Sequence, residues 1–145
     1  MIGLFVAPAV AAIGDALASA GADEGSIAVV GNAKLATALA TARTVVPIAL
    51  SARAAKKVPG AIDDFSTVAD RSLAAVVGVS VAEAEDWEAQ LAVWTRAVRD
   101  GGAVVFVDRG HAPEAARRAL CAGLTEIEQR HAGRTIVTSG LVTHL

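Results

Sequence analysis

The feature that most constrains the fold is the segment from Leu73 to Val81, whose sequence LAAVVGVSV is almost continuously apolar. A strand with one solvent-facing side alternates apolar and polar residues, whereas a strand covered on both faces of a parallel sheet is apolar along most of its length. We interpret three further apolar runs as buried strands: Ser26–Gly31 (SIAVVG), Thr44–Leu50 (TVVPIAL) and Ala103–Val107 (AVVFV). Pro47 cannot donate a hydrogen bond to a ladder, which favours an edge position for the second of these runs.

Helical patterns separate the apolar runs. One apolar stripe is formed by Trp87, Leu91, Trp94 and Val98, which recur at helical spacing. Asp86 is the predicted N-cap of this helix, and Asp100-Gly101-Gly102 is expected to end it. Two shorter helices are predicted for Lys34–Thr41 and Ser51–Val58. Strands that alternate with helices indicate right-handed βαβ units, so we predict an α/β fold, a three-layer Rossmann-like sandwich with a mostly parallel central sheet.

Three segments carry weaker patterns. A weak third strand is predicted within Ala61–Ala69. A long helix is predicted from Pro113 to about His131, with His131 in a favourable dipole contact at its end and Gly133 as its stop. The residues that this helix is expected to bury are Ala116, Leu120, Leu124 and Ile127. The final stretch, Arg134–Leu145, is predicted to form either two short strands around Ser139-Gly140 or one bulged strand.

The apolar N-terminal segment, residues 1–22, is interpreted as a helix that covers the domain. Its apolar residues at helical spacing are Val10, Ile13 and Leu17. No Lys or Arg precedes Lys34, so the basic region of a signal peptide is missing. Proline, glycine and aspartate interrupt the stretch, which disfavours a membrane helix. Without a visible linker or repeat, we expect residues 1–145 to form a single domain that is cytoplasmic and binds no membrane.

Charge and cysteine content exclude several function classes. The 145 residues include 13 basic and 15 acidic ones, for a formal net charge of −2, which is not the basic surface typical of nucleic-acid binding. Cys121 is alone, so an internal disulfide and a cysteine-rich zinc site are excluded, and we interpret it as a small core residue. The histidines lack metal-ligand spacing, so no metal site is predicted. We assign no catalytic residue, although His111 beside Asp108 follows a predicted strand, where ligands bind in open α/β folds.

The stretch from Ser72 to Asp108 resembles the second half of class I S-adenosylmethionine-dependent methyltransferases. SLAAVVGVSVAEAEDWEAQLAVWTRAVRDGGAVVFVD follows that family's order of strand, loop, helix, Gly-Gly turn and strand. Upstream, IAVVGNAKLATALA looks like the family's first strand, cofactor loop and helix. VVPIALSARAAKKV looks like its second strand and helix, and IDDFSTVADRSLAAVV like its third strand and the approach to the fourth. The resemblance covers most of residues 26–145 and implies that family's fold, strand order and cofactor.

The cofactor loop departs from the family's pattern. That pattern is G-x-G-x-G, which lets the backbone approach the cofactor closely. Gly31 matches the first glycine, whereas Ala33 and Leu35 take the other two positions, and we expect Leu35 to project where the helix needs tight packing or the ligand needs space. Val29 and Ala49 replace the acidic residues that the family has before the loop and at the end of its second strand. Lost hydrogen bonds to a ligand's buried hydroxyls cost a few kcal/mol, which implies weak cofactor binding.

Four residues remain as a candidate cofactor site. Gly31 and Asn32 occupy the strand-to-helix turn, and Asp64 (or Asp63) with Phe65 lies where the family contacts adenine. Plainer interpretations stand beside these assignments. Gly31-Asn32 can form a tight turn without a ligand, and the second group can be a surface turn with one buried phenylalanine.

Three functions are compatible with these observations. A preserved fold pattern with an altered loop favours a non-catalytic, degenerate methyltransferase-like domain that binds no cofactor and acts as a protein-interaction or regulatory module. The first alternative is an active S-adenosylmethionine-dependent methyltransferase with a divergent cofactor loop. The second is a structural subunit of a larger enzyme complex. A protein partner or a homo-oligomer is expected, because the apolar N-terminal helix can cover a partner or a second copy.

Overall fold

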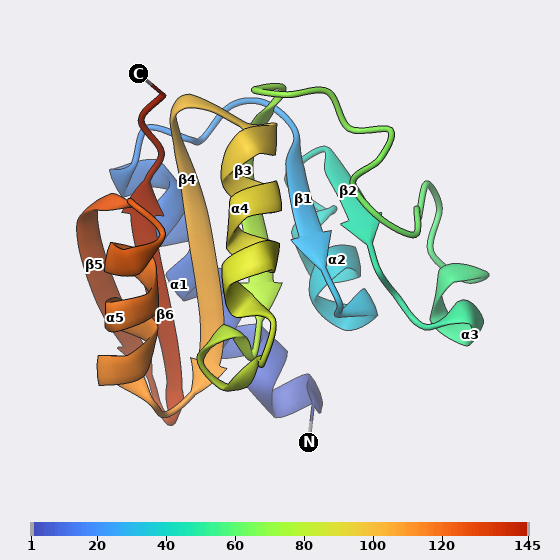
Figure 1. Ribbon diagram of the computed structural model, residues 1–145. Helices are drawn as coiled ribbons and strands as arrows, with labels where there is room; N and C mark the ends of the chain where they lie inside the picture. Colours follow the sequence, from blue (N-terminus) through green and yellow to red (C-terminus); the bar gives the residue numbers. More distant parts are fainter. Residues whose placement is uncertain (1, 145) are drawn as a thin grey trace.

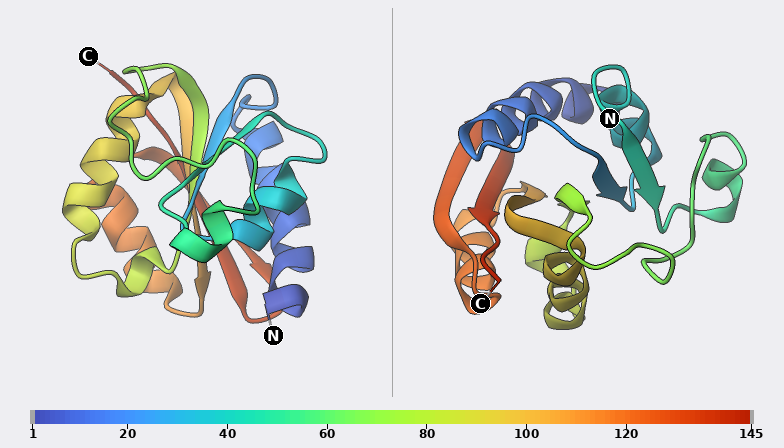
Figure 2. Two further views of the ribbon diagram at one scale, coloured as in Figure 1. Left: turned by 90° about the vertical axis from the view of Figure 1, so that its right-hand side faces the viewer. Right: turned by 90° about the horizontal axis from the view of Figure 1, so that it is seen from above.

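The computed structural model describes residues 2–144, with side chains from Pro8 onward, so the predicted segments 1–22 and 134–145 each include one terminal residue outside the described range. A six-stranded sheet lies between two helical layers, as the sequence predicts (Figures 1 and 2). The strand order is β2–β1–β3–β4–β6–β5. All neighbours pair in parallel except β6 (Thr135–Leu141), which is antiparallel to both β4 and β5. The sheet is therefore mostly parallel, in agreement with the prediction.

The predicted apolar strands are confirmed. They are β1 (Ile27–Val30), β2 (Val45–Ile48), β3 (Leu73–Val79) and β4 (Val98–Arg109). In β3 every residue from Leu73 to Gly78 is buried, as expected for a strand covered on both faces. β2 is an edge strand, as Pro47 indicates: its carbonyl accepts the Ile62 N–H, and the missing proline N–H leaves no unpaired donor on the outer edge.

Two helices cover each face of the sheet (Figure 2). On one face, α1 (Ile2–Ser19) and α2 (Ala33–Leu39) pack on Ile27, Val77 and Val105, among others. On the other face, α4 (Trp87–Ala97) and α5 (Ala112–Cys121) pack on Val76, Val104 and Phe106, among others. The short helix α3 (Ala52–Ala55) lies beyond the β2 edge, where it covers neither face.

The predicted stripe of α4 faces the sheet. Leu91, Trp94 and Val98 are buried, and Trp87 is half-buried. Trp94 lies directly over Gly78 of β3, because a Cβ at Gly78 would overlap the indole ring. The glycine therefore provides the space in which the largest side chain of α4 meets the sheet.

Of the two expectations for the ends of α4, the N-cap position is confirmed and the C-terminal end is wrong. Asp86 is at the N-cap position, but its carboxylate makes no capping hydrogen bond. The helix ends at Ala97, before Asp100-Gly101-Gly102, which belongs to β4. The register of β4 against β3 shifts here, and a Cβ at Gly102 would lie 2.5 Å from the Ala74 carbonyl oxygen. Gly102 is thus required by the close approach of two strands rather than by a helix end.

The predicted long C-terminal helix is wrong beyond Cys121. Gly123 takes a left-handed conformation with φ of 85°, which ends α5. The chain then enters β5 (Thr125–Ala132), which forms a hairpin with β6. The expected buried face is also wrong: Ala115 and Ala119 face the core, Ala116 is half-buried, and Leu120 is 67% exposed.

The residues after α5 follow from this hairpin. His131 lies exposed on β5, so it makes no contact at a helix end, and Gly133 is in the hairpin turn. β6 is one continuous strand, so the alternative of two short strands around Ser139-Gly140 is wrong. Charged residues alternate along β5 because it is the other edge of the sheet, whereas Leu120, Leu124 and Ile127 keep a helical spacing across the end of α5 and so favour a longer helix.

The predicted third strand within Ala61–Ala69 is absent except for one parallel bridge between Ile48 and Ile62. Immediately afterwards Asp64 Oδ1 accepts the Ser66 N–H at 2.9 Å, which bends the chain away from the sheet edge. Within residues 2–144, no helix is long and apolar enough to cross a membrane.

Candidate functional site

The carboxyl ends of β1 to β4 lie at the same edge of the sheet, the lower edge in Figure 1. At each end the chain turns through a left-handed residue. Their φ values are 80° at Gly31, 59° at Ala49, 55° at Ser80 and 59° at His111. Three of the four are not glycine, and such strained residues concentrate at functional sites. This is also the edge at which open α/β sheets bind ligands.

An open pocket of about 300 Å³ lies at this edge, at the ends of β1 and β2. Its volume is at the lower limit of roughly 300–1,000 Å³ that is usual for small-molecule sites. Ile48, Phe65 and Trp94 give it apolar walls, and the start of α4 closes one side. The remaining lining residues are Val30, Ala49, Asp63, Asp64, Asp86, Ala89, Gln90 and Val93. An apolar floor with carboxylates and one amide suits a flat aromatic ligand that carries hydroxyl or amine groups.

The turn at Gly31 and Asn32 has a local structural role. Gly31 is exposed, and a Cβ at this position would meet only Val79 at 3.9 Å, so its left-handed conformation rather than crowding requires glycine. Asn32 is the N-cap of α2, and its Oδ1 accepts the Leu35 N–H at 2.8 Å. The plainer interpretation of a tight turn is therefore satisfied by the fold, and the turn is located beside Val30 at the pocket edge.

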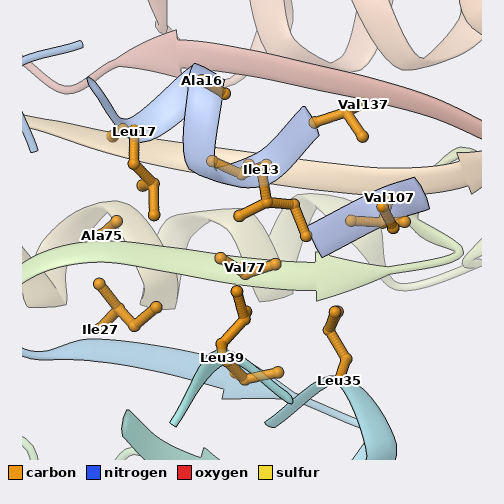
Figure 3. Close-up of a cluster of buried hydrophobic side chains, with 14 of the residues drawn as sticks. Ile13, Ala16, Leu17, Ile27, Leu35, Leu39, Ala75, Val77, Val107 and Val137 are labelled. Carbon is orange, nitrogen blue, oxygen red and sulfur yellow. The ribbon is translucent and has the colours of Figure 1, made fainter. Parts of the chain in front are cut away.

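Of the two places expected for Leu35, the structure shows the packing interface between helix and sheet, and not the ligand space. Leu35 is fully buried and extends from α2 toward the sheet, together with Leu39 (Figure 3). It packs on the face of α1 and α2, whereas the pocket residues Phe65 and Trp94 belong to the opposite face. The Asn32 cap fixes the phase of α2 so that its third residue faces the sheet. The altered loop thus leaves the pocket open.

The predicted pair Asp64 and Phe65 lines the pocket, together with Asp63 and Ala49. Phe65 is buried against the α4 face, and Asp64 is exposed. Hydrogen bonds from the Ser66 side chain and backbone lower the pKa of Asp64 below its ordinary value, so its carboxylate is available as an acceptor at neutral pH. Ala49 presents no carboxylate, but two carboxylates of the following loop reach the same pocket.

A second polar group lies at the carboxyl ends of β3 and β4, and sequence reasoning identified only part of it. Asp108 is 2% exposed, and its Oδ1 accepts the Ala82 N–H at 2.9 Å. His111 Nε2 lies 2.9 Å from Glu83 Oε1 on the surface above. The sequence placed His111 and Asp108 in one loop, but only the sheet register shows that Asp108 is buried against the turn after β3.

Other candidate residues are not part of a site. Cys121 is exposed at the end of α5, so its interpretation as a core residue is wrong. Ser139 is buried within β6, and His144 Nε2 lies 2.7 Å from the Val98 carbonyl oxygen. Among residues 2–144, no group of three or more His, Cys, Asp or Glu side chains is arranged to hold a metal ion.

A pocket of about 410 Å³ lies at the opposite edge of the sheet, near the amino end of β3. It is polar, and its charged groups are already engaged in part: Arg96 Nε lies 3.1 Å from Asp70 Oδ1. Since ligands of open α/β sheets bind at the carboxyl ends of the strands, the pocket beside Gly31 and Phe65 is the stronger candidate.

Several solved structures have a fold similar to that of this chain. PigF with S-adenosylhomocysteine superposes with a TM-score of 0.72 at 15% identity, over 97% of this chain and 56% of that one. A Haloferax volcanii methyltransferase in complex with the Trm112 activator gives 0.67 at 13% identity, over 94% of each chain. Thermus thermophilus RsmC, a 16S rRNA methyltransferase in complex with S-adenosylmethionine and guanosine, gives 0.61 at 18% identity. The match covers 83% of this chain and only 36% of RsmC.

No protein-family model matches the sequence, and no curated protein matches it significantly. The structural likeness is nevertheless consistent, since the solved structures that match it are S-adenosylmethionine-dependent methyltransferases. The chain therefore has the fold of class I S-adenosylmethionine-dependent methyltransferases. The resemblance inferred from Ser72–Asp108 is confirmed at the level of the fold.

Proposed function

We propose that this chain binds S-adenosylmethionine in the pocket beside Gly31 and Phe65 and acts as a methyltransferase. The observation that carries the proposal is the open pocket at the ends of β1 and β2, at the edge where the fold places its ligand. Two neighbours hold S-adenosylmethionine or S-adenosylhomocysteine. This proposal reverses the order of the functions favoured by the sequence, because Leu35 does not fill the ligand space.

The residues present fit the nucleoside part of this cofactor. Phe65, Val93 and Trp94 offer apolar surface for the adenine ring, and Asp63 or Asp64 can accept hydrogen bonds from the ribose hydroxyls in place of the missing carboxylate at Ala49. The Gly31 turn lies beside the pocket and can approach the amino-acid part. The cofactor, when bound, supplies an activated methyl group. The chain then has to orient donor and acceptor and exclude water.

Titration calorimetry with S-adenosylmethionine and S-adenosylhomocysteine tests the proposal. Ala89 is an exposed α4 residue that lines the pocket, so Ala89→Leu adds a side chain to the ligand space and is expected to weaken binding by about tenfold or more. Ala92→Leu is the matched control, since Ala92 is exposed on the same helix and does not line the pocket. Saturable binding that Ala89→Leu weakens and Ala92→Leu retains supports the proposal. No heat at millimolar ligand contradicts it.

A non-catalytic interaction module is the second candidate. The absence of a carboxylate at Ala49 favours it, and a neighbour of nearly equal length is in complex with a protein activator. For this candidate we expect no cofactor binding and a stable protein complex or homo-oligomer. Light scattering measures the second property: a dimer or larger species supports self-association, and a strict monomer at high concentration contradicts it.

A further inference from the structure

The turn that follows β3 is held in place by β4 and α5. It comprises the left-handed Ser80 and the 3-10 turn Val81–Glu83, and it precedes α4. The Ser80 N–H donates to the Val107 carbonyl at 2.8 Å, and the next residue of β4, Asp108, accepts the Ala82 N–H. From α5, Arg118 Nη1 donates to the carbonyls of Val81 at 2.6 Å and Ala84 at 2.8 Å. The Asp108 carboxylate of β4 and the Arg118 guanidinium of α5 therefore both hold this turn by hydrogen bonds to its backbone.

This turn precedes the helix that forms one wall of the pocket. α4 begins four residues after it, and the N-cap residue Asp86 lines the pocket together with Ala89 and Gln90 of α4. Asp86 makes no side-chain capping hydrogen bond, and the Arg118 guanidinium that holds the turn also lies 5.1 Å from the centroid of the Trp87 ring at the start of α4. The turn also follows Val79, whose side chain a Cβ at Gly31 would meet at 3.9 Å. It thus connects the proposed cofactor pocket with the end of β4.

Only one of the two carboxylate oxygens of Asp108 accepts a hydrogen bond from the turn. Its Oδ2 is buried and finds no hydrogen-bond partner among the described residues. A buried carboxylate with one unpaired oxygen costs more free energy than a solvated one, so Asp108 calls for a structural explanation. The charged groups around it are Glu83 from the turn, His111 from the loop after β4 and Arg118 from α5.

We propose that Asp108 is a positioning residue that holds the turn after β3 and, through it, the α4 wall of the cofactor pocket. Its link to ligand binding rests on the function proposed above, whereas its link to α4 does not. Burial is the main cause that raises the pKa of Asp108, with Glu83 in the same direction; the Ala82 hydrogen bond, His111 and Arg118 oppose it. Protonation of Asp108 is therefore expected to change the structure at the start of α4.

Amide NMR of the ¹⁵N-labelled chain across the acid range tests this inference without any ligand. We expect the amides of Ala82 and of Asp86 to Gln90 to shift together in one titration, with a midpoint above the ordinary 3.8 of an aspartate. Asp108→Asn should abolish that titration, because the asparagine amide does not ionise in this range. Any amide shifts that remain in Asp108→Asn belong to the other carboxyl groups. Identical titrations in wild type and Asp108→Asn would overturn the inference. Asparagine keeps a side-chain oxygen that can accept the Ala82 N–H, so this comparison changes the charge and not the hydrogen bond.

The second measurement is the affinity for S-adenosylhomocysteine. Asp108→Ala removes the acceptor of the Ala82 N–H, so we expect fast hydrogen exchange at Ala82 and about tenfold weaker binding, most of which Asp108→Asn recovers. Asp100→Ala is the control, since Asp100 Oδ1 accepts the His144 N–H at 2.8 Å at the far end of β4. If Asp108→Ala changes neither the affinity for S-adenosylhomocysteine nor the amide chemical shifts of α4, then Asp108 stabilises only its own turn and the inference is wrong. If wild type binds no ligand, the proposed function fails and the amide titration alone decides.

Discussion

At the scale of single residues, the contact between Trp94 and Gly78 determines how α4 meets the sheet. The indole ring occupies the space above a glycine of the central strand, and Trp94 is 3% exposed. Close packing of this kind makes both the removal of the ring and the addition of one methyl group unfavourable.

We expect Trp94→Ala to lower the free energy of unfolding by about 3–5 kcal/mol, as for other buried large-to-alanine changes. Gly78→Ala should cost about 1–3 kcal/mol through overpacking against the ring. Because the cavity left by Trp94 accepts the new methyl group, the double variant should lose less than the sum. Urea denaturation of the four proteins measures this coupling, and strict additivity would show that the two residues do not share the contact.

Glu114 gives a prediction for pH dependence. Hydrogen bonds from Arg117 and Arg118 lower its pKa from 4.5 to about 2 in the folded state. Between these pH values the unfolded chain binds more protons, so the contribution of Glu114 is complete above pH 4.5 and is lost as pH falls through about 2. Its exposure keeps the effect modest.

The stability difference between wild type and Glu114→Gln should therefore shrink as the pH is lowered through this range, as measured by thermal unfolding. Glu88→Gln, an exposed change on α4, serves as the control. A difference that stays constant from neutral pH down to pH 2 would contradict the assignment.

At the scale of elements, the end of α5 shows how one glycine redirects the chain. Gly123 is left-handed and has no atom near its missing Cβ, so its conformation alone requires glycine. Gly14 provides the opposite case, because it lies exposed within α1 with ordinary φ and open space around it.

Gly123→Ala is expected to destabilise the chain by about 1–2 kcal/mol, the cost of a left-handed alanine. Gly14→Ala should stabilise it by about 0.5–1 kcal/mol, since alanine is the better helix former. Differential scanning calorimetry of both variants provides the comparison. Equal shifts in the same direction would mean that α5 does not end at Gly123.

At the scale of the whole molecule, the sheet is unevenly covered. Helices lie on both faces of β3 and β4, whereas the segment from residue 49 to 72 leaves the β2 edge, contacts it again by one bridge, and returns to β3 with only Phe65 buried (Figure 2). Local opening requires little energy where few apolar contacts and hydrogen bonds are lost.

Native-state hydrogen exchange should therefore be slowest at the amides of β3 and β4 and fastest in the 49–72 segment. Ligand binding to the proposed pocket, which includes Asp63, Asp64 and Phe65, should slow exchange in that segment first. Protection of residues 63–65 equal to that of β3 in the free chain would show that this segment is part of the core.

The sequence predicted the central strands, the α4 stripe and the edge position of β2 because each depends on a local pattern: a continuous apolar run, a helical period or a missing N–H. It failed for residues 122–132, because apolar residues at helical spacing (Leu120, Leu124 and Ile127) continue past the end of α5 and obscure the alternating charges of the edge strand β5. It also failed for the third strand, where a hydrogen bond from Ser66 to Asp64 outweighs a short apolar signal.

The candidate site divides in the same way. The sequence by itself determined that Gly31 and Asn32 follow the end of a strand, and hence that they approach one edge of a parallel sheet, whereas Asp64 and Phe65 were indicated only by the family resemblance. Only the tertiary structure decided that Leu35 points into the core, that α4 forms the pocket wall and that Asp108 is buried against the turn after β3. These facts depend on helix phase and on the register between strands distant in sequence, which no local pattern of residues encodes.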